Sequence, residues 1–259
     1  MSDPSAAAAK PPRDPALDLP LIEKKIETCR GFKIVRIQRA LQYSRYLHFK
    51  NYGDIRPLLL PISKPEVLKT LMPMGSDNIR QLLLEVIRRL VNYLNASCYL
   101  VDHTRFLLGK AYGRSDPLRK EIEARIESTY FGASIPELVR GLRHTGSHVT
   151  LPMVTFSFSF ERMALETRLN LAAWRDEARG WKKLPKAQEY LAAQTADPEL
   201  GPILEAYHQL DSQFFSWLDG RQREAHKADF RALEALQKEL RDKFKEAGIN
   251  PNELTSLVL

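Results

Sequence analysis

Apolar residues recur at three- and four-residue steps along most of the chain, which keeps them on one face of an α-helix. The clearest run covers residues 77–110. Its apolar positions include Ile79, Leu82, Leu83, Val86, Ile87, Leu90, Val91 and Leu94. This pattern predicts a long amphipathic helix that contributes to the core.

Shorter helical patterns precede this run. Residues 21–50 fit one or two helices, with an interruption at Gly31. The next segment, which contains Gly53, Pro57 and Pro61, is predicted to be a loop. Ser63-Lys-Pro-Glu66 then has the form of a capping box with proline in the first turn, so a short helix is expected from there.

Helical patterns also follow the long run. One helix is expected from Ser115-Asp-Pro117 to about Tyr130, and another from a second capping box at Ser134-Ile-Pro-Glu137. After the ribbon described next, helix is expected over 172–194 with a break near Gly180. A very long helix over 198–247, with a kink at Gly220, closes the chain.

The period changes at Pro152. Phenylalanines then alternate with small polar residues at Phe156, Phe158 and Phe160, which predicts a half-buried strand. The segment Leu165–Leu171 offers a partner strand. Alternating phenylalanines could stack bases, but on a ribbon packed against helices they are more often core residues. The predicted fold class is therefore mainly α, with a small two-stranded β-ribbon at about 153–171 and a long C-terminal helix.

The amino-acid composition indicates a boundary between a disordered tail and the folded part of the chain near the N-terminus. Residues 1–19 combine Pro, Ala, Ser and Asp without apolar periodicity and are predicted to be a disordered tail. A helical extension is expected over 20–75 and the main helical domain over 76–259. No apolar run is long enough to cross a membrane, and Cys29 and Cys98 stand apart without a metal-binding or disulfide spacing. We therefore expect a cytoplasmic protein without membrane association.

The net charge of +7 changes the list of expected partners. With 39 Lys and Arg against 32 Asp and Glu, the chain favours a polyanion such as RNA, because bound cations release counterions from phosphates. The same charges on amphipathic helices could instead form solvated faces. Two basic groups are candidate RNA contacts. They are Arg175, Arg179, Lys182 and Lys183, and Arg221, Arg223 and Lys227.

Candidate chemistry is concentrated in one segment. The common nucleotide-binding, hydrolase and metalloprotease motifs are missing, and the only clustered histidines lie in Leu142-Arg-His-Thr-Gly-Ser-His148. His148 could move a proton of an RNA 2'-hydroxyl near neutral pH, and Arg143 could stabilise the charged phosphorane. These positions point about 140° apart on a regular helix. Either Gly146 breaks the helix, or a second chain completes the site in a two-fold dimer.

The string LRHTGSHVTLPM, at the end of a predicted helix and before the TFSFSF ribbon, resembles the HEPN (higher eukaryotes and prokaryotes nucleotide-binding) superfamily. It is most similar to larger bacterial and phage-encoded HEPN-like proteins, which carry an LRNxxxH-x-x-LP run before a short ribbon. The resemblance covers roughly Asp77 to Leu218, and the Tyr-Leu-Val-Asp-His103 segment is also similar.

The resemblance implies a dimerising HEPN-like helical bundle and a metal-independent endoribonuclease, in a defence or toxin–antitoxin context. It assigns the catalytic pair, contributed by both chains, to Arg143 and His148. It also implies a homodimer with RNA as substrate and an antitoxin or regulatory partner. His144 replaces the usual asparagine, and Thr150 stands where many toxins carry tyrosine. The alternative is a catalytically inactive RNA-binding or protein-interaction subunit.

Three further residues are candidates for a supporting role. Asp102 and His103 lie within an apolar stretch, either as polar support for the site or as a satisfied buried pair. His144 and His148 are four residues apart, a spacing that could hold zinc, but no third ligand is evident. We therefore expect neither a metal nor another cofactor. His48, His208 and His226 are expected to be ordinary surface or helix-face residues.

Overall fold

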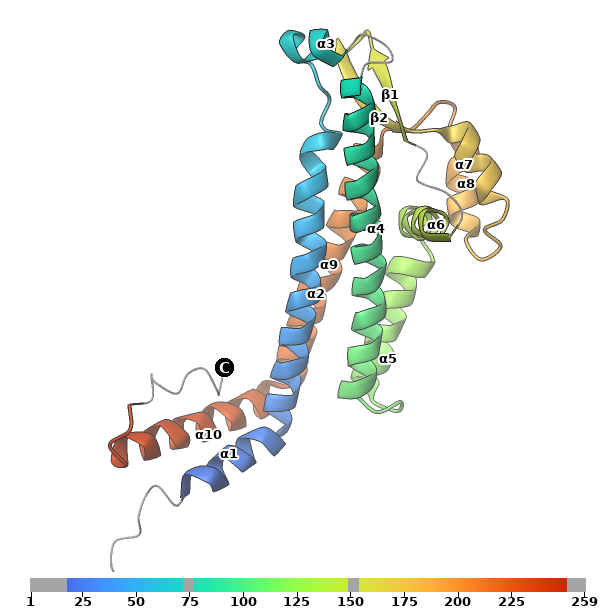
Figure 1. Cartoon of the computed structure of the whole chain (residues 1–259). Helices are drawn as coiled ribbons and strands as arrows, with labels where there is room; N and C mark the ends of the chain where they lie inside the picture. Colours follow the sequence, from blue (N-terminus) through green and yellow to red (C-terminus); the bar gives the residue numbers. More distant parts are fainter. Residues whose placement is uncertain (1–17, 72–76, 149–153, 251–259) are drawn as a thin grey trace, which may run out of the picture. The chain divides into compact units, whose positions relative to one another are not determined.

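The computed structural model describes residues 18–71, 77–148 and 154–250, apart from the side chains of Ser147 and His148. The predicted tail therefore lies outside the described residues except for Asp18 and Leu19, and so do Pro152 and Thr150. The elements are α1 (Leu19–Thr28), α2 (Arg30–Leu59), α3 (Pro65–Leu71), α4 (Asp77–Ala111), α5 (Pro117–Ile126), the π-helical turn η2 (Glu127–Phe131), α6 (Ser134–His148), β1 (Val154–Ser159), β2 (Ala164–Leu169), α7 (Leu171–Ala178), α8 (Pro185–Ala193), α9 (Leu200–Ala225) and α10 (Lys227–Glu246). The protein is mainly α-helical with one two-stranded hairpin, as the periodicity predicts (Figure 1).

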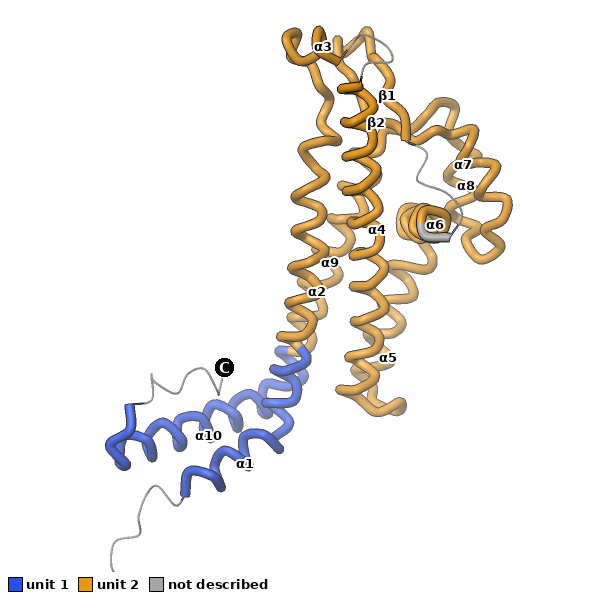
Figure 2. The backbone as a smooth tube through the Cα atoms, viewed as in Figure 1, with its two compact units in different colours: residues 1–37, 223–259 blue, residues 38–222 orange. Residues whose placement is uncertain are grey.

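The chain divides into two compact units, residues 1–37 with 223–259 and residues 38–222 (Figure 2). In the first unit α1 packs against α10 through a small apolar core. Its buried members are Leu19, Ile22, Ile26, Leu233, Leu240 and Phe244. Gly31 lies inside α2, and a Cβ there would collide with the carbonyl of Asp229. Glycine thus permits a close backbone approach, and the helical break lies at Cys29 instead.

The second unit contains the long helices α4 and α9 and most of α2 (Figure 1). Three side-chain contacts tie α2 to its neighbours. The Ser44 hydroxyl lies 2.6 Å from His103 Nδ1 on α4, Arg45 pairs with Asp219 on α9, and Tyr52 donates a hydrogen bond to Glu205 on α9. The buried large side chains Tyr93, Tyr130, Tyr207, Phe214 and Phe215 fill the interior.

Two predicted interruptions are wrong. α2 continues through Gly53 and Pro57 to Leu59, although proline removes a helical hydrogen bond. Burial of Ile55 and Leu59 offsets this local cost. Near the C-terminus, α9 continues through Gly220 to Ala225, and the break before α10 lies at His226.

The hairpin pairs β1 and β2 antiparallel, from Val154 opposite Leu169 to Ser159 opposite Ala164. The pairing agrees with the sequence prediction, but burial does not follow the phenylalanines. β2 is the buried strand, Phe156 and Phe158 are half-buried, and Phe160 is 82% exposed. The expectation that Phe160 is a core residue is therefore wrong. No helix among the described residues is long and apolar enough to span a membrane.

Candidate functional site: a cationic pocket beside α6

Helix α6 carries the Arg143 motif and packs against α4 and α8 (Figure 1). Gly141 makes this packing possible, because a Cβ at that position would overlap the ring of Trp181. The indole Nε1 of Trp181 donates a hydrogen bond to Thr145 Oγ1 at 3.1 Å, and both residues are buried. The loop between α7 and α8 is therefore held directly against α6.

Glu137 fixes the end of the same loop. Its buried carboxylate accepts hydrogen bonds from the backbone N–H groups of Lys186, at 2.8 Å, and Ala187, at 3.3 Å. These groups belong to the first turn of α8, where backbone donors lack helical partners. α6 begins at Ser134 as predicted, but the Glu137 carboxylate caps α8 rather than completing a capping box in its own helix.

A pocket of about 570 Å³ opens between these elements. Its lining residues come from α4, η2, α6, the 179–184 loop and α9. They include Cys98, Asp102 and Arg105, then Tyr130, Phe131, Arg140, Arg143 and His144, then Trp181, Lys182, Lys183 and Tyr207. Five of the residues proposed from the sequence thus share one concave site, namely Asp102, Arg143, His144, Lys182 and Lys183.

The pocket is strongly cationic. Five of its side chains are Lys or Arg, against the single carboxylate of Asp102. None of the five forms an ion pair with a carboxylate of the described residues. Some arginines elsewhere do form ion pairs, such as Arg88 with Glu85. Unneutralised cations gathered at a concave surface favour an anionic ligand.

Two of these cations are positioned by an aromatic ring. The guanidinium of Arg140 lies 4.3 Å from the centroid of Phe131, and that of Arg105 lies 5.3 Å from it. Such contacts leave the in-plane N–H donors of each guanidinium available to a ligand. Neither arginine stood out in the sequence, because no motif joins positions on α4 and α6.

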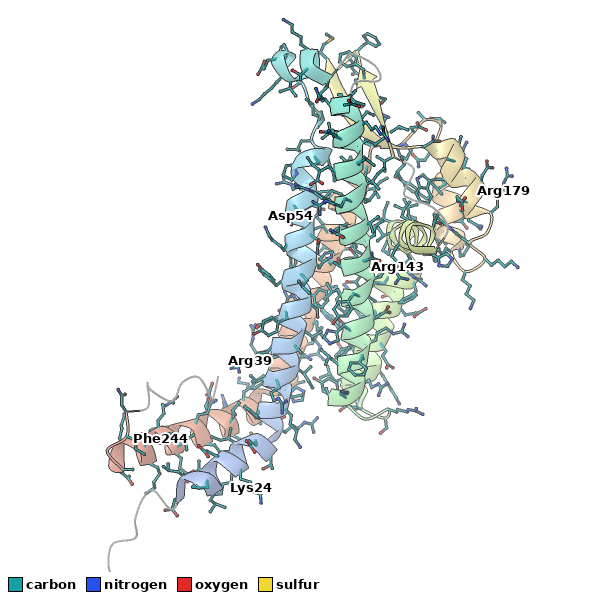
Figure 3. All side chains as sticks on the ribbon, in the orientation of Figure 1. Lys24, Arg39, Asp54, Arg143, Arg179 and Phe244 are labelled. Carbon is teal, nitrogen blue, oxygen red and sulfur yellow. The ribbon has the colours of Figure 1, made fainter. Side chains whose placement is uncertain are left out.

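Arg143 lies on α6 and is one of the residues that line the pocket (Figure 3). Its Nε is buried and has no hydrogen-bond partner among the described residues. Leaving a buried charged donor unsatisfied costs free energy, which an anion in the pocket would recover. Burial raises the pKa of the nearby Cys98 thiol to about 11, an effect that the positive charge of Arg143 partly opposes.

His148 is the last residue of α6, and its side chain lies outside the described residues. The helix continues through Gly146, so a break there does not turn position 148 back toward Arg143. On a regular helix the two positions point about 140° apart. A break at Gly146, one of the two arrangements expected from the sequence, is therefore absent from α6.

The remaining candidates lie elsewhere. His103 sits on another part of α4, stacked between Tyr99 and Phe106, and burial lowers its pKa. Arg175 donates hydrogen bonds to carbonyl groups at the end of α8, including Leu191 O at 3.0 Å. Arg179 is exposed at the outer side of α7 and α8, 3.3 Å from Asp176 (Figure 3). None of the three lines the pocket.

Sequence reasoning missed a polar network behind the pocket. Tyr130, which lines the pocket, donates a 2.7 Å hydrogen bond to the buried Asp211, and the other oxygen of Asp211 lies 2.8 Å from His48 Nε2. His48 and His226 are buried, and His208 is stacked on Tyr52, so of the two expected placements, surface or helix face, the surface placement is wrong. The sequence does contain a sign that His48 is buried. This residue lies at helical spacing within a row of buried residues on α2, namely Leu41, Ser44, Tyr52, Ile55 and Leu59.

No cluster of three or more His, Cys, Asp or Glu side chains suited to a metal occurs in the part of the chain that the structure describes. Comparisons with protein-family models, curated proteins and solved structures find no match to this chain. The site is therefore interpreted from its own residues.

Proposed function

We propose that the pocket binds the phosphate backbone of RNA and that the chain is a metal-independent endoribonuclease of the HEPN type, working as a homodimer. The observation that carries the proposal is the buried, unpartnered Nε of Arg143 in a pocket with four further cations that lack carboxylate partners among the described residues. The hairpin that closely follows α6 also supports the family resemblance.

In this proposal each residue of the site has a separate role in RNA binding or cleavage. Arg143 donates hydrogen bonds to the non-bridging oxygens, where negative charge increases in the phosphorane. His148 of the second chain accepts the proton of the 2'-hydroxyl. Lys182 and Lys183 bind the flanking backbone, and the products are a 2',3'-cyclic phosphate and a 5'-hydroxyl.

The test is cleavage of labelled RNA in EDTA by wild type, Arg143→Ala and His148→Ala. We expect cleavage by wild type and a loss of at least about 100-fold in each variant. Arg179→Ala is the matched control, because it removes an exposed arginine that does not line the pocket. Unaltered RNA with wild type would contradict the nuclease, and equal rates in all variants would contradict this site.

A non-catalytic RNA-binding subunit is the second candidate. The uninterrupted α6 favours it, since Arg143 and His148 of one chain do not converge on one phosphodiester. Molar mass in solution separates the two candidates. RNA binding that depends on Arg143, by a strict monomer without cleavage, would support the binding subunit.

A further inference from the structure

Transesterification of RNA needs two proton transfers, and Arg143 and His148 together account for only one of them. A base removes the proton of the 2'-hydroxyl, and an acid must protonate the departing 5'-oxygen. Arg143 is unsuited to the second task, since a guanidinium does not release its proton at neutral pH. Resting on the function proposed above, we propose that His144 is the acid that protonates the 5'-oxygen.

The first support is the place of His144 in the pocket. It follows Arg143 on α6 and lines the same cavity as Lys182 and Lys183. It is exposed, so a substrate oxygen can reach it. Among the histidine side chains that the structure describes, His144 is the one that lines this pocket; His48 and His226 are buried, and His103 contacts Ser44.

The second support is that the other titratable side chains of the pocket are poor proton donors near neutral pH. Its other titratable side chains are guanidinium and ammonium groups, the Asp102 carboxyl, the Cys98 thiol and the phenols of Tyr130 and Tyr207. Arginine and lysine hold their protons too firmly near neutral pH, and carboxylates are normally already ionised. Burial raises the pKa of Cys98 to about 11 and also raises the pKa of Tyr130 and of Tyr207, and the Tyr130 hydroxyl already donates a hydrogen bond to Asp211. Imidazole is the group suited to release a proton at neutral pH.

The register of α6 supplies the third support. Positions 144 and 148 lie one turn apart, about 40° from each other around the helix and about 6 Å along it. Position 143 lies about 100° from 144. Both Arg143 and His144 line the pocket, so neighbouring positions on one face of α6 bring the guanidinium and the imidazole to the same cavity.

The proposed step is balanced without any co-reactant. Neutral His148 takes the 2'-hydroxyl proton while the 2'-oxygen forms its bond to phosphorus. The bond between phosphorus and the 5'-oxygen breaks, its electron pair goes to that oxygen, and protonated His144 supplies the proton. The products are a 2',3'-cyclic phosphate and a 5'-hydroxyl, and exchange with water restores both imidazoles.

The experiment compares two RNA substrates with the chain of 259 residues in EDTA. One is ordinary RNA, and the other carries sulfur in place of the 5'-oxygen at the cleaved linkage. A thiolate leaves without protonation, so the second substrate needs no acid. We expect His144→Ala to slow cleavage of ordinary RNA by about 100- to 10,000-fold and that of the sulfur substrate by only a few fold.

Two further variants separate proton donation from a structural role. Arg143→Ala should slow both substrates, since both develop charge on the non-bridging oxygens. His144→Asn keeps a polar side chain that does not titrate, and should behave as His144→Ala does. The acidic side of the pH–rate profile reports the base, and the alkaline side reports the acid, so the alkaline decline should disappear in both His144 variants.

The outcomes are distinct. Equal slowing of both substrates by His144→Ala would overturn the assignment, because His144 would then bind or position RNA. Unchanged rates for both substrates would overturn it as well, while leaving the nuclease intact. A wild-type protein that cleaves neither substrate would overturn the proposed function and the assignment together.

Discussion

The imidazole Nε2 of His48 lies 2.8 Å from the Oδ2 of Asp211, and both side chains are fully buried between α2 and α9. Ser97 donates its hydroxyl proton to the Tyr93 carbonyl at 2.8 Å, so its oxygen is left to accept from His48 Nδ1 at 3.2 Å. The ring of His48 therefore lies between the Ser97 hydroxyl and the Asp211 carboxyl group, and this buried polar contact lies behind the pocket.

Removing one partner of this pair should be destabilising. We expect Asp211→Asn and His48→Leu each to lower the free energy of unfolding by about 1–3 kcal/mol, because the remaining polar group stays buried without its partner. Urea denaturation measures the change. Asp219→Asn is the control, since its pair with Arg45 is partly exposed and should matter by about 1 kcal/mol or less.

A double-mutant cycle sharpens this prediction. The variant with both His48→Leu and Asp211→Leu should lose less stability than the sum of the single variants, because neither polar group is left buried without the other. Additive losses would contradict an interaction between the two side chains.

Glycine at 141 and glycine at 220 should respond oppositely to alanine. Gly141→Ala places a Cβ against the Trp181 ring and should destabilise the protein by about 1–3 kcal/mol. Gly220 lies inside α9 with open space around its Cα, so Gly220→Ala should stabilise by about 0.5–1 kcal/mol. Denaturation midpoints of the two variants measure this contrast. A Gly141→Ala variant as stable as wild type would contradict the close packing of α6 on the loop.

Periodicity predicted the elements that are buried on one side. The repeated three- and four-residue steps of α4 and the alternation around Phe156 identify a long helix and a hairpin, since each pattern leaves few alternatives. Single-residue signals predicted less. Pro57 and Gly220 suggest interruptions, but their local cost of about 1–3 kcal/mol is offset by the burial of whole helix faces.

The candidate site was predictable only in part. Arg143, Lys182 and Lys183 follow from local clustering, and the structure brings them into one pocket. Arg105 and Arg140 line the same pocket and contact the ring of Phe131. No spacing in the sequence predicts these contacts. Arg175 was predicted to contact a ligand but caps the end of α8 instead. A cluster of basic residues in a sequence is compatible with either role.

Substituting Arg175 or Arg179 by alanine removes the same charge, but the two substitutions should change the stability of the protein by different amounts. Arg175 donates to the carbonyls of Leu191, Ala192 and Gln194, so Arg175→Ala should cost about 1–3 kcal/mol. Arg179→Ala breaks an exposed pair and should cost about 1 kcal/mol or less. Chemical denaturation measures both variants. Equal effects would contradict the capping role of Arg175.

RNA affinity should depend on salt through the pocket lysines. Each phosphate contact removed should reduce the slope of log affinity against log salt by about 0.7 for single-stranded RNA. Lys182→Ala and Lys183→Ala are expected to do so, as measured by fluorescence anisotropy with a labelled oligonucleotide. Lys50→Ala is the matched control, since Lys50 pairs with Asp54 and does not line the pocket. An unchanged slope in both pocket variants would place the RNA elsewhere.

Cys98 should make stability fall in alkaline solution. Burial raises the pKa of its thiol from 9.0 to about 11, so the unfolded chain loses this proton first. The stabilisation is complete below pH 9 and is lost as the pH rises toward 11, by at most about 3 kcal/mol. Buried tyrosines contribute in the same direction, because burial also raises the pKa of Tyr130 and Tyr207. Urea denaturation at several pH values should therefore show a shallower decline for Cys98→Ala than for wild type, and parallel curves would contradict a buried thiol at this position.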